Sequence, residues 1–128
     1  MKPEETKQFT IEALEDVKGR DIVVLDTRHL SSLFDCMIIA SAESTRQVKA
    51  LANNVREKLK ALGAQVLSVE GEQSGEWVLV DLGAIVVHVM QPGIRQYYKL
   101  EELWNQPEVK PKRPRSRKKA AHPQPPAG

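Results

Sequence analysis

The alternation of apolar and polar positions is clearest over residues 77–90, WVLVDLGAIVVHVM, where two short apolar runs meet at Gly83 and Ala84. Two runs of strand length joined by a two-residue turn predict a β-hairpin. In that register one face of the hairpin is purely aliphatic. It pairs Leu82 with Ile85, Val80 with Val87, and Val78 with Val89. We expect this face to lie on the hydrophobic core.

The opposite face of the same hairpin is chemically mixed. It pairs Asp81 with Val86, Leu79 with His88, and Trp77 with Met90. A carboxylate and an imidazole among large apolar groups are unusual for a core, and the aliphatic face already supplies one. We therefore interpret the mixed face as a surface that meets a partner.

Two segments have the apolar periodicity of helices. Residues 6–18 carry a one-sided apolar stripe, and Gly19 is placed to end it. A longer stripe runs up to Gly63; Ser44 precedes it as an N-cap, and Gln47 three residues later completes a capping box. The outer positions of this second helix are basic. They comprise Arg46, Lys49, Arg56, Lys58 and Lys60. Such a face either contacts phosphate or is simply solvated, and the sequence leaves both readings open.

The remaining segments predict strands and a last helix. Residues 21–26 and 36–40 are short apolar runs expected to form buried strands, with residues 27–35 as a loop at the sheet edge. Residues 65–69 predict a third strand before the hairpin, and residues 94–104 a final helix. With the second helix as the crossover of a parallel pair, this order predicts an α/β fold with a mixed sheet of about five strands and flanking helices.

Composition predicts one domain followed by a basic tail. The 128 residues are 41% hydrophobic, which is enough for one core. Seven of the 19 basic residues lie in the tail, so the chain before it has 12 basic and 16 acidic side chains, a formal net charge of −4. Six of the eight prolines also follow position 106. We place the domain at residues 1–106 and expect residues 107–128 to be disordered when alone.

The single cysteine, Cys36, lies in an apolar run and excludes a disulfide within one chain. This suits a reducing compartment. No apolar run approaches the roughly 20 residues that cross a bilayer, and the first residues lack a signal-peptide hydrophobic region. We expect a cytoplasmic protein.

Catalytic and cofactor motifs are absent from the sequence. There is no glycine-rich phosphate loop, and His29, His88 and His122 are too scattered to form a metal set with the one cysteine, so we expect neither cofactor nor metal. Asp81 and His88 fall near each other on the mixed face. They form either an acid/base pair or, as we favour in the absence of a nucleophile, a structural or binding contact.

Residues 75–104, GEWVLVDLGAIVVHVMQPGIRQYYKLEELW, resemble the signature of the ribosomal silencing factor family, also called the Iojap or DUF143 family. The resemblance extends back through DIVVLDTRHLSSLFDCMIIASAESTRQVKALANNV and covers residues 10–104, without the tail. The positions that match the signature are Trp77, Asp81, His88, Arg95, Tyr97, Tyr98, Glu101 and Trp104. Ala84 departs from it, since an acidic residue is common there, and Leu82 stands where an aromatic is frequent.

This resemblance implies a fold similar to nucleotidyltransferases but without their catalytic carboxylates. It implies docking on ribosomal protein fourteen of the large subunit, at the face that meets the small subunit. Blocking subunit joining in this way represses translation when nutrients are scarce. Steric exclusion requires no chemistry, so we expect no enzyme activity. The alternative is a nucleotidyltransferase-like enzyme, which would bind nucleoside triphosphates and magnesium.

Aromatic side chains suggest where the partner is contacted, since four of the six aromatics lie in the signature segment. Trp77 and Tyr98 are the first candidates because such rings are enriched in interface hot spots, although Trp77 could instead be a core residue. Trp104 is expected to pack the last helix onto the sheet. Arg95 either bridges to Asp81 or Glu101 or contacts the partner. The full set of expected partner contacts is Trp77, Asp81, Leu82, His88, Arg95, Tyr97 and Tyr98.

The basic tail has two readings, an appendage that contacts ribosomal RNA phosphates or a solubilising extension. Its cations are Lys110, Lys112, Arg113, Arg115, Arg117, Lys118 and Lys119. A homodimer that buries the mixed face when the protein is free is a further expectation, and it is compatible with ribosome binding if the dimer dissociates.

Overall fold

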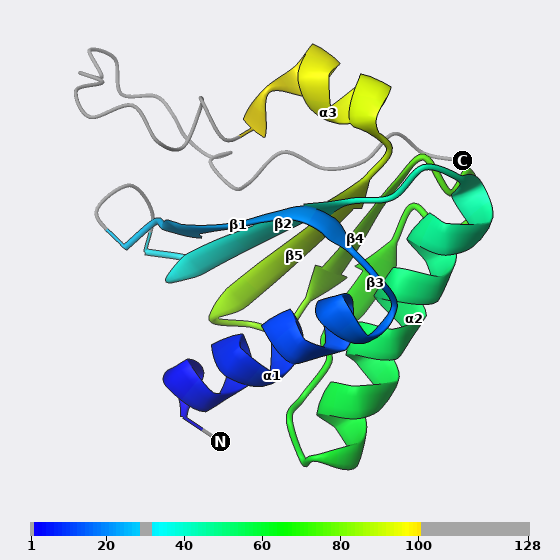
Figure 1. The fold of residues 1–128 in the computed structure, drawn as a ribbon. Coiled ribbons are helices and arrows are strands. Elements are labelled where there is room, and N and C mark those ends of the chain that lie inside the picture. The colour runs from blue at the N-terminus through cyan, green and yellow to red at the C-terminus, as the bar shows by residue number, and fades with distance from the viewer. Residues whose placement is uncertain (1, 29–31, 101–128) are drawn as a thin grey trace, which may run out of the picture.

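Five strands form one mixed sheet in the structure, a computed structural model that describes residues 2–28 and 32–100 (Figure 1). The strands are β1 (Arg20–Asp26), β2 (Cys36–Ser41), β3 (Ser68–Glu70), β4 (Trp77–Asp81) and β5 (Ile85–Met90). Their order across the sheet is β1-β2-β5-β4-β3. Only β2 and β5 run parallel, because the chain between them passes through a helix and the β3–β4 pair. The predicted mixed sheet of about five strands is confirmed.

The hairpin has the predicted register. Val80 lies opposite Val87 and Leu79 opposite His88, and the other pairs follow in step. The amide of Leu82 donates to the carbonyl oxygen of Ile85 at 2.9 Å and so closes the turn. Gly83 has φ of 91°, a left-handed conformation that favours glycine at this position.

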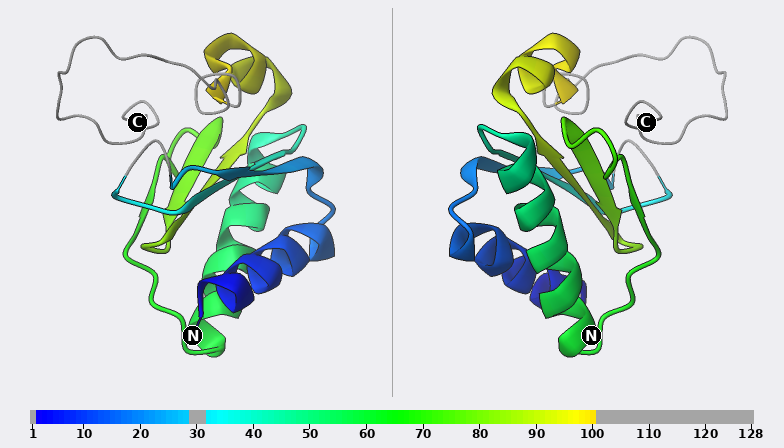
Figure 2. Two further views of the ribbon diagram at one scale, coloured as in Figure 1. Left: turned by 90° about the vertical axis from the view of Figure 1, so that its left-hand side faces the viewer. Right: turned by 90° about the vertical axis from the view of Figure 1, so that its right-hand side faces the viewer.

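Three helices complete the described chain: α1 (Pro3–Asp16), α2 (Thr45–Ala61) and α3 (Pro92–Tyr98). Helices α1 and α2 pack together on one face of the sheet, whereas α3 lies on the other side (Figure 2). The aliphatic hairpin face meets α1 and α2 and forms the first core, as predicted. Its members include Leu14, Leu51, Val55, Leu59, Val78, Val80 and Val87.

Helix α1 begins three residues earlier than the apolar stripe predicts. Pro3 occupies the first turn, and Glu5 accepts a hydrogen bond from the backbone of Lys2, so polar capping extends the helix beyond its apolar positions. Lys18 takes the left-handed conformation after the helix, with φ of 62°. Gly19 is needed for a different reason: a Cβ there would lie 3.0 Å from the Leu14 carbonyl oxygen.

Helix α2 begins at its predicted cap, where the Ser44 side chain accepts a hydrogen bond from the Gln47 amide at 3.1 Å. The reciprocal half of the predicted capping box is absent. The Gln47 side chain instead donates to the carbonyl oxygen of Val17 at 3.2 Å and so ties α2 to the end of α1. A long-range contact has replaced a local one.

The first strand corrects one expectation. β1 was expected to be buried, but it is an edge strand with Leu25 as its buried side chain. β3, at the other edge, has three residues and begins later than predicted. His29, Glu101, Trp104, His122 and the tail at residues 107–128 lie outside the described residues, and so do the predictions made for them.

Candidate functional site

The mixed face of the hairpin is a second core. Trp77 and His88 are 1% and 0% exposed, and the indole Nε1 donates to His88 Nδ1 at 2.8 Å. The apolar side chains around them come from both hairpin strands, from β1, β2 and the loop between them, and from the chain after α3. They include Leu25, Phe34, Met37, Ile39, Leu79, Val86, Met90 and Leu100. The expectation that Trp77 and His88 are exposed contacts is therefore wrong.

The carboxylate of Asp81 stabilises the hairpin turn. Its Oδ1 accepts a hydrogen bond from the Gly83 amide at 2.9 Å, and the side chain is half-buried. His88 Nδ1 instead accepts the hydrogen bond from the indole of Trp77. The two side chains thus have different hydrogen-bond partners, and the acid/base pair considered for this face is not observed. Leu82, expected as an added contact, is 9% exposed and belongs to the first core.

Arg95 is buried in α3 and points back to the sheet. Its guanidinium donates to the Ser41 hydroxyl at 2.7 Å, at the end of β2. A bridge from Arg95 to Asp81, one of the alternatives for this residue, is not formed, because Asp81 lies at the hairpin turn and accepts a hydrogen bond from Gly83. Glu101, the other candidate for such a bridge, lies outside the described residues. Sequence reasoning missed Ser41, since a serine ending an apolar strand gives no signal of a partner 54 residues away. This bond holds α3 over the second core.

Two tyrosines at the end of α3 carry the exposed aromatic surface. Tyr97 is 78% exposed and Tyr98 42% exposed, and their rings meet edge to face with centroids 4.9 Å apart. Tyr98 also lies against Trp77, with ring centroids at 4.8 Å. A line of rings therefore runs from the exposed Tyr97 through Tyr98 and Trp77 to the buried His88. Large exposed rings on a rigid base suit a protein partner.

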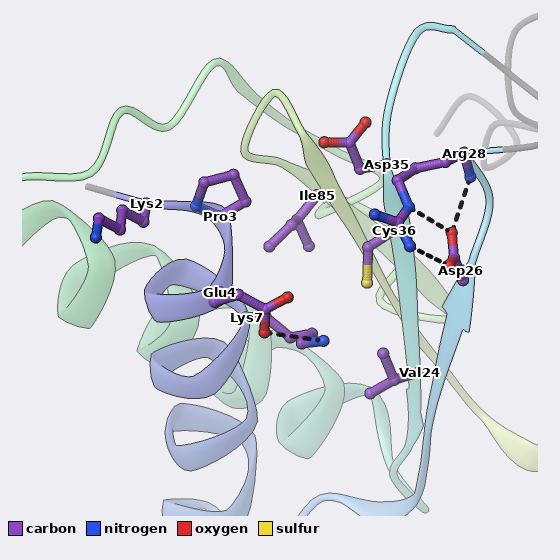
Figure 3. Close-up of a pocket in the computed structure, with 10 residues that line it drawn as sticks. All are labelled: Lys2, Pro3, Glu4, Lys7, Val24, Asp26, Arg28, Asp35, Cys36 and Ile85. Carbon is purple, nitrogen blue, oxygen red and sulfur yellow. Dashed lines mark hydrogen bonds and ion pairs between the residues drawn. The ribbon is translucent and has the colours of Figure 1, made fainter.

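A separate cavity of about 570 Å³ lies between the start of α1 and the β1–β2 edge (Figure 3). Its apolar wall includes Val24, Cys36 and Ile85, and charged side chains surround it. Burial raises the pKa of the Cys36 thiol to about 11. The thiol therefore stays protonated near neutral pH and is a poor nucleophile.

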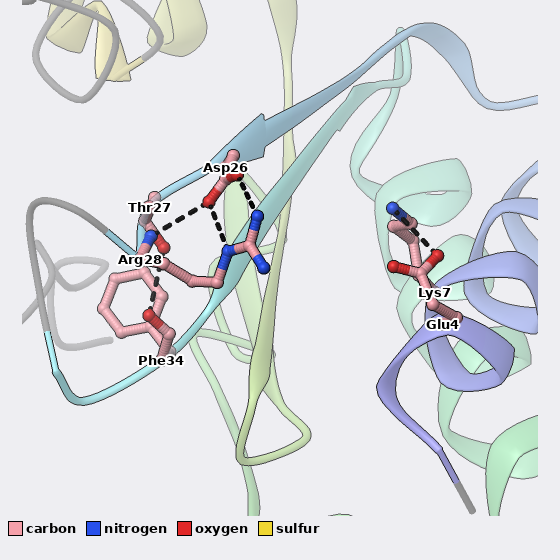
Figure 4. Close-up of polar contacts among 6 residues, drawn as sticks. All are labelled: Glu4, Lys7, Asp26, Thr27, Arg28 and Phe34. Carbon is pink, nitrogen blue, oxygen red and sulfur yellow. Dashed lines mark hydrogen bonds and ion pairs between the residues drawn. The ribbon is translucent and has the colours of Figure 1, made fainter.

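Charges around this cavity are largely paired. Arg28 contacts Asp26 at 2.6 and 3.0 Å, and this carboxylate raises the pKa of Arg28 (Figure 4). Lys7 pairs with Glu4 at 3.3 Å. The Thr27 hydroxyl donates to the carbonyl oxygen of Phe34 at 3.1 Å and closes the β1–β2 loop from inside. The residues that line this cavity therefore do not pair a nucleophile with a general base.

In residues 2–28 and 32–100, no three side chains of His, Cys, Asp or Glu gather as metal ligands. No helix in this part of the chain is both long and apolar enough to span a bilayer.

A family model described as "Ribosomal silencing factor during starvation" matches residues 1–127. The chain belongs to the ribosomal silencing factor family. The Chromobacterium violaceum ribosomal silencing factor is 57% identical over 104 residues, covering 81% of this chain and 85% of that protein. The Bacillus subtilis ribosomal silencing factor is 40% identical over 92 residues, covering 72% and 78%. The mouse "Mitochondrial assembly of ribosomal large subunit protein 1" is 31% identical over 97 residues, covering 73% of this chain and 42% of that protein.

Solved structures resemble this ribosomal silencing factor fold over most of its length. A crystal structure of a Chromobacterium violaceum protein matches with a TM-score of 0.81 at 54% identity, covering 86% of this chain and 92% of that one. A Bacillus halodurans structure matches with a TM-score of 0.72 at 35% identity, covering 79% and 94%. The resemblance inferred from the hairpin signature is confirmed. Ribosomal silencing factors are regulatory proteins, so family membership indicates a ribosome-associated silencing role.

Proposed function

We propose that this ribosomal silencing factor docks on ribosomal protein fourteen of the large subunit and blocks joining of the small subunit. Translation then slows when nutrients are scarce, and the protein acts in the cytoplasm. Family membership supports a ribosome-associated role. The name of the mouse relative refers to the ribosomal large subunit and supports the choice of that subunit.

The observation that carries the docking surface is the exposed pair Tyr97 and Tyr98 on its buried base. Tyr98 is supported from below by Trp77, and Trp77 by its hydrogen bond to His88. The tyrosine rings therefore offer contact area to a partner, and few rotatable side-chain bonds lose their freedom on binding. In this arrangement Trp77 and His88 are supports, and Asp81 shapes the hairpin turn at the other end of the same sheet face. Arg95 keeps α3 in place through Ser41.

Blocking of subunit joining requires the bound domain to occupy space, and no reacting group. The Cys36 thiol, whose pKa is about 11, supplies no nucleophile near neutral pH. The basic tail at residues 107–128 is proposed to add contacts to ribosomal RNA phosphates, which increase affinity at low salt. Deleting residues 107–128 is expected to weaken large-subunit binding and to flatten its salt dependence. If the deletion variant and wild type bind with equal affinity at each of two salt concentrations, the tail has no part in the mechanism.

The docking surface is tested by pelleting the full-length protein with isolated large subunits. The double variant Tyr97→Ala/Tyr98→Ala is expected to lose about 2 kcal/mol of binding free energy, or roughly 30-fold in affinity, as for an interface hot spot. Leu62→Ala is the matched control because Leu62 is also a large exposed side chain, 44% exposed, at the end of α2. If wild-type protein stays in the supernatant when large subunits are pelleted, the proposed function is contradicted.

The second measurement follows subunit joining by light scattering. Wild-type protein, added to large subunits before small subunits, is expected to lower the amplitude of association in proportion to its occupancy. The double tyrosine variant should restore the amplitude, and Leu62→Ala should not. If wild-type protein binds large subunits but does not change subunit association, the docking site is supported and the blocking mechanism is contradicted.

A further inference from the structure

The two long helices have segregated charges. Helix α1 has five acidic side chains and one basic side chain, whereas α2 has five basic side chains and one acidic side chain, Glu57. A helix face that is merely solvated usually mixes both signs, because pairs three or four residues apart stabilise it. The basic surplus of α2 also stands out against the formal charge of −4 that the chain carries before its tail. This charge therefore needs an explanation beyond solvation.

The basic side chains of α2 do not all have the same role. Lys58 contacts Glu12 at 3.6 Å and Asp16 at 3.2 Å, so it is bound to α1. The other cations lie along one line with an asparagine between them, at spacings of three, four, three and four residues. We call this line the α2 stripe, and it comprises Arg46, Lys49, Asn53, Arg56 and Lys60. Side chains at such spacing share one face of a helix.

The stripe presents a continuous row of donors. Four of its members are exposed, and Arg56 is half-buried. Within the described residues, no carboxylate lies within ion-pair distance of Arg46, Lys49 or Lys60. Arg56 contacts Asn53 at 2.7 Å and Glu57 at 3.4 Å. From Arg46 to Lys60 the row extends about 21 Å, at 1.5 Å per residue.

A hollow beside the stripe has the size and donors for a phosphate group. It has a volume of about 360 Å³ and lies between the second half of α2 and strand β3. Arg56 and Lys60 line it with cationic donors, and Glu72 is the one acidic side chain among its lining residues. Ser68 also lines it, and its hydroxyl lies 3.5 Å from the Glu70 carboxylate. At the other end of the stripe, the stem of Lys49 is packed against Gly75, where a Cβ would come within 2.9 Å of Lys49 Cε. Both ends are therefore partly organised.

The stripe suits a nucleic acid better than a protein. It contains no apolar or aromatic side chain, whereas the centre of a protein interface is depleted in charge and enriched in aromatic residues. Rows of lysine and arginine with an interspersed amide are typical of contacts to phosphate and sugar. α2 covers the sheet face opposite α3, so the stripe is separate from the tyrosine pair and can be occupied at the same time.

We infer that the α2 stripe binds the phosphate backbone of large-subunit ribosomal RNA beside the docking site, with one phosphate in the hollow lined by Arg56, Lys60 and Ser68. This inference rests on the proposed function for the identity of the RNA. The stripe and the tail then act as two independent cationic contacts. The tyrosine pair selects the site, and the stripe adds affinity that depends on salt but not on base sequence.

The test compares two full-length variants that lose the same charge. The stripe variant carries Arg46→Gln, Lys49→Gln, Arg56→Gln and Lys60→Gln. The control variant replaces four cations that are already paired with carboxylates, and carries Lys7→Gln, Arg20→Gln, Arg28→Gln and Lys58→Gln. Circular dichroism and thermal unfolding verify that both remain folded. Binding to isolated large subunits is then measured by pelleting between 50 and 200 mM salt.

The plot of log affinity against log salt has a negative slope, and each lost phosphate contact makes it shallower by about 0.7–0.9. With four contacts, wild-type affinity should fall over this salt range by about 50- to 150-fold more than that of the stripe variant. The control variant should keep nearly the wild-type slope. Glu72→Gln should have the opposite effect and raise affinity at low salt, because it removes the carboxylate that repels a phosphate in the hollow. Equal slopes for wild type and stripe variant, or equal losses in both variants, would overturn the inference.

A second arm separates this inference from the proposed function. A fluorescent 20-base-pair RNA hairpin is titrated with the same proteins, and binding is followed by anisotropy. Loss of binding by the stripe variant alone supports a phosphate contact even if wild-type protein fails to pellet with large subunits, an outcome that would refute only the proposed function. Dependence on the stripe with large subunits but not with the RNA hairpin would indicate an acidic protein surface and overturn the RNA assignment.

Discussion

The indole Nε1 of Trp77 donates a 2.8 Å hydrogen bond to Nδ1 of His88 inside the second core. Because an indole nitrogen only donates, Nδ1 accepts, and the imidazole is the neutral tautomer with its proton on Nε2. The bond lets two polar groups occupy an apolar layer without an unsatisfied donor on Trp77. It also fixes the plane of the ring on which Tyr98 rests.

Trp77→Phe should destabilise the fold by about 1–3 kcal/mol through the buried Nδ1 that loses its donor, with a further cost from the smaller ring. Urea unfolding measures the change. A double-mutant cycle with His88→Leu should give a coupling of about 0.5–3 kcal/mol, since each substitution removes the same bond. Additive losses would mean that the bond contributes no net stability.

Arg95→Met should cost about 1.5–3 kcal/mol, because a hydrogen bond from a charged donor to Ser41 is lost from a buried position. Gln96→Met is the matched control, as Gln96 is an exposed neighbour on α3. Thermal unfolding compares the two variants. If Arg95→Met unfolds at the temperature of Gln96→Met, the contact with Ser41 does not hold α3 on the sheet.

The Cys36 thiol makes stability fall at alkaline pH. Its pKa is raised from 9.0 to about 11 in the folded protein, so the unfolded chain releases the proton first. This contribution is complete below pH 9.0 and is lost as the pH rises towards about 11. Unfolding by urea from pH 8 upwards should therefore show wild type losing stability relative to Cys36→Ala. Parallel curves for the two proteins would contradict a buried neutral thiol.

The cap of α2 gives a local prediction. Ser44→Ala removes the bond to the Gln47 amide and should cost about 1 kcal/mol. Ser32→Ala is the control because Ser32 is exposed and lies outside the helices and strands. The difference between their urea midpoints gives the value of the cap. A midpoint for Ser44→Ala that matches Ser32→Ala would show that packing alone defines the start of α2.

Local patterns were sufficient to predict most elements. The pairing of Val80 with Val87 follows from a two-residue turn and the two-residue period of a strand, and it is observed. The cap at Ser44 follows in the same way from hydrogen bonding within a few residues. The same reasoning failed at Gln47, because its side chain donates to the carbonyl oxygen of Val17, which directly follows α1 and is 30 residues away in the chain.

The candidate site shows the same division. The sequence identified Tyr97, Tyr98, Trp77 and His88 as a group, and the structure places them in one line of rings. The sequence did not indicate that Trp77 is buried, because a mixed face has the same residue pattern whether solvent or a later segment of the chain covers it. Nor did it indicate Ser41 as the partner of Arg95, since neither residue has a local pattern that requires the other.

By itself, the sequence determined the family, the hairpin register and the segregation of charge between the two long helices, because each depends on residues close together in the chain. Only the tertiary structure decided which strands form the edges, which rings are buried and which cations remain unpaired among the described residues. These depend on which distant segments pack together. The mixed face became a core because α3 and the chain after it return to cover it, and the exposed surface moved outward to Tyr97 and Tyr98.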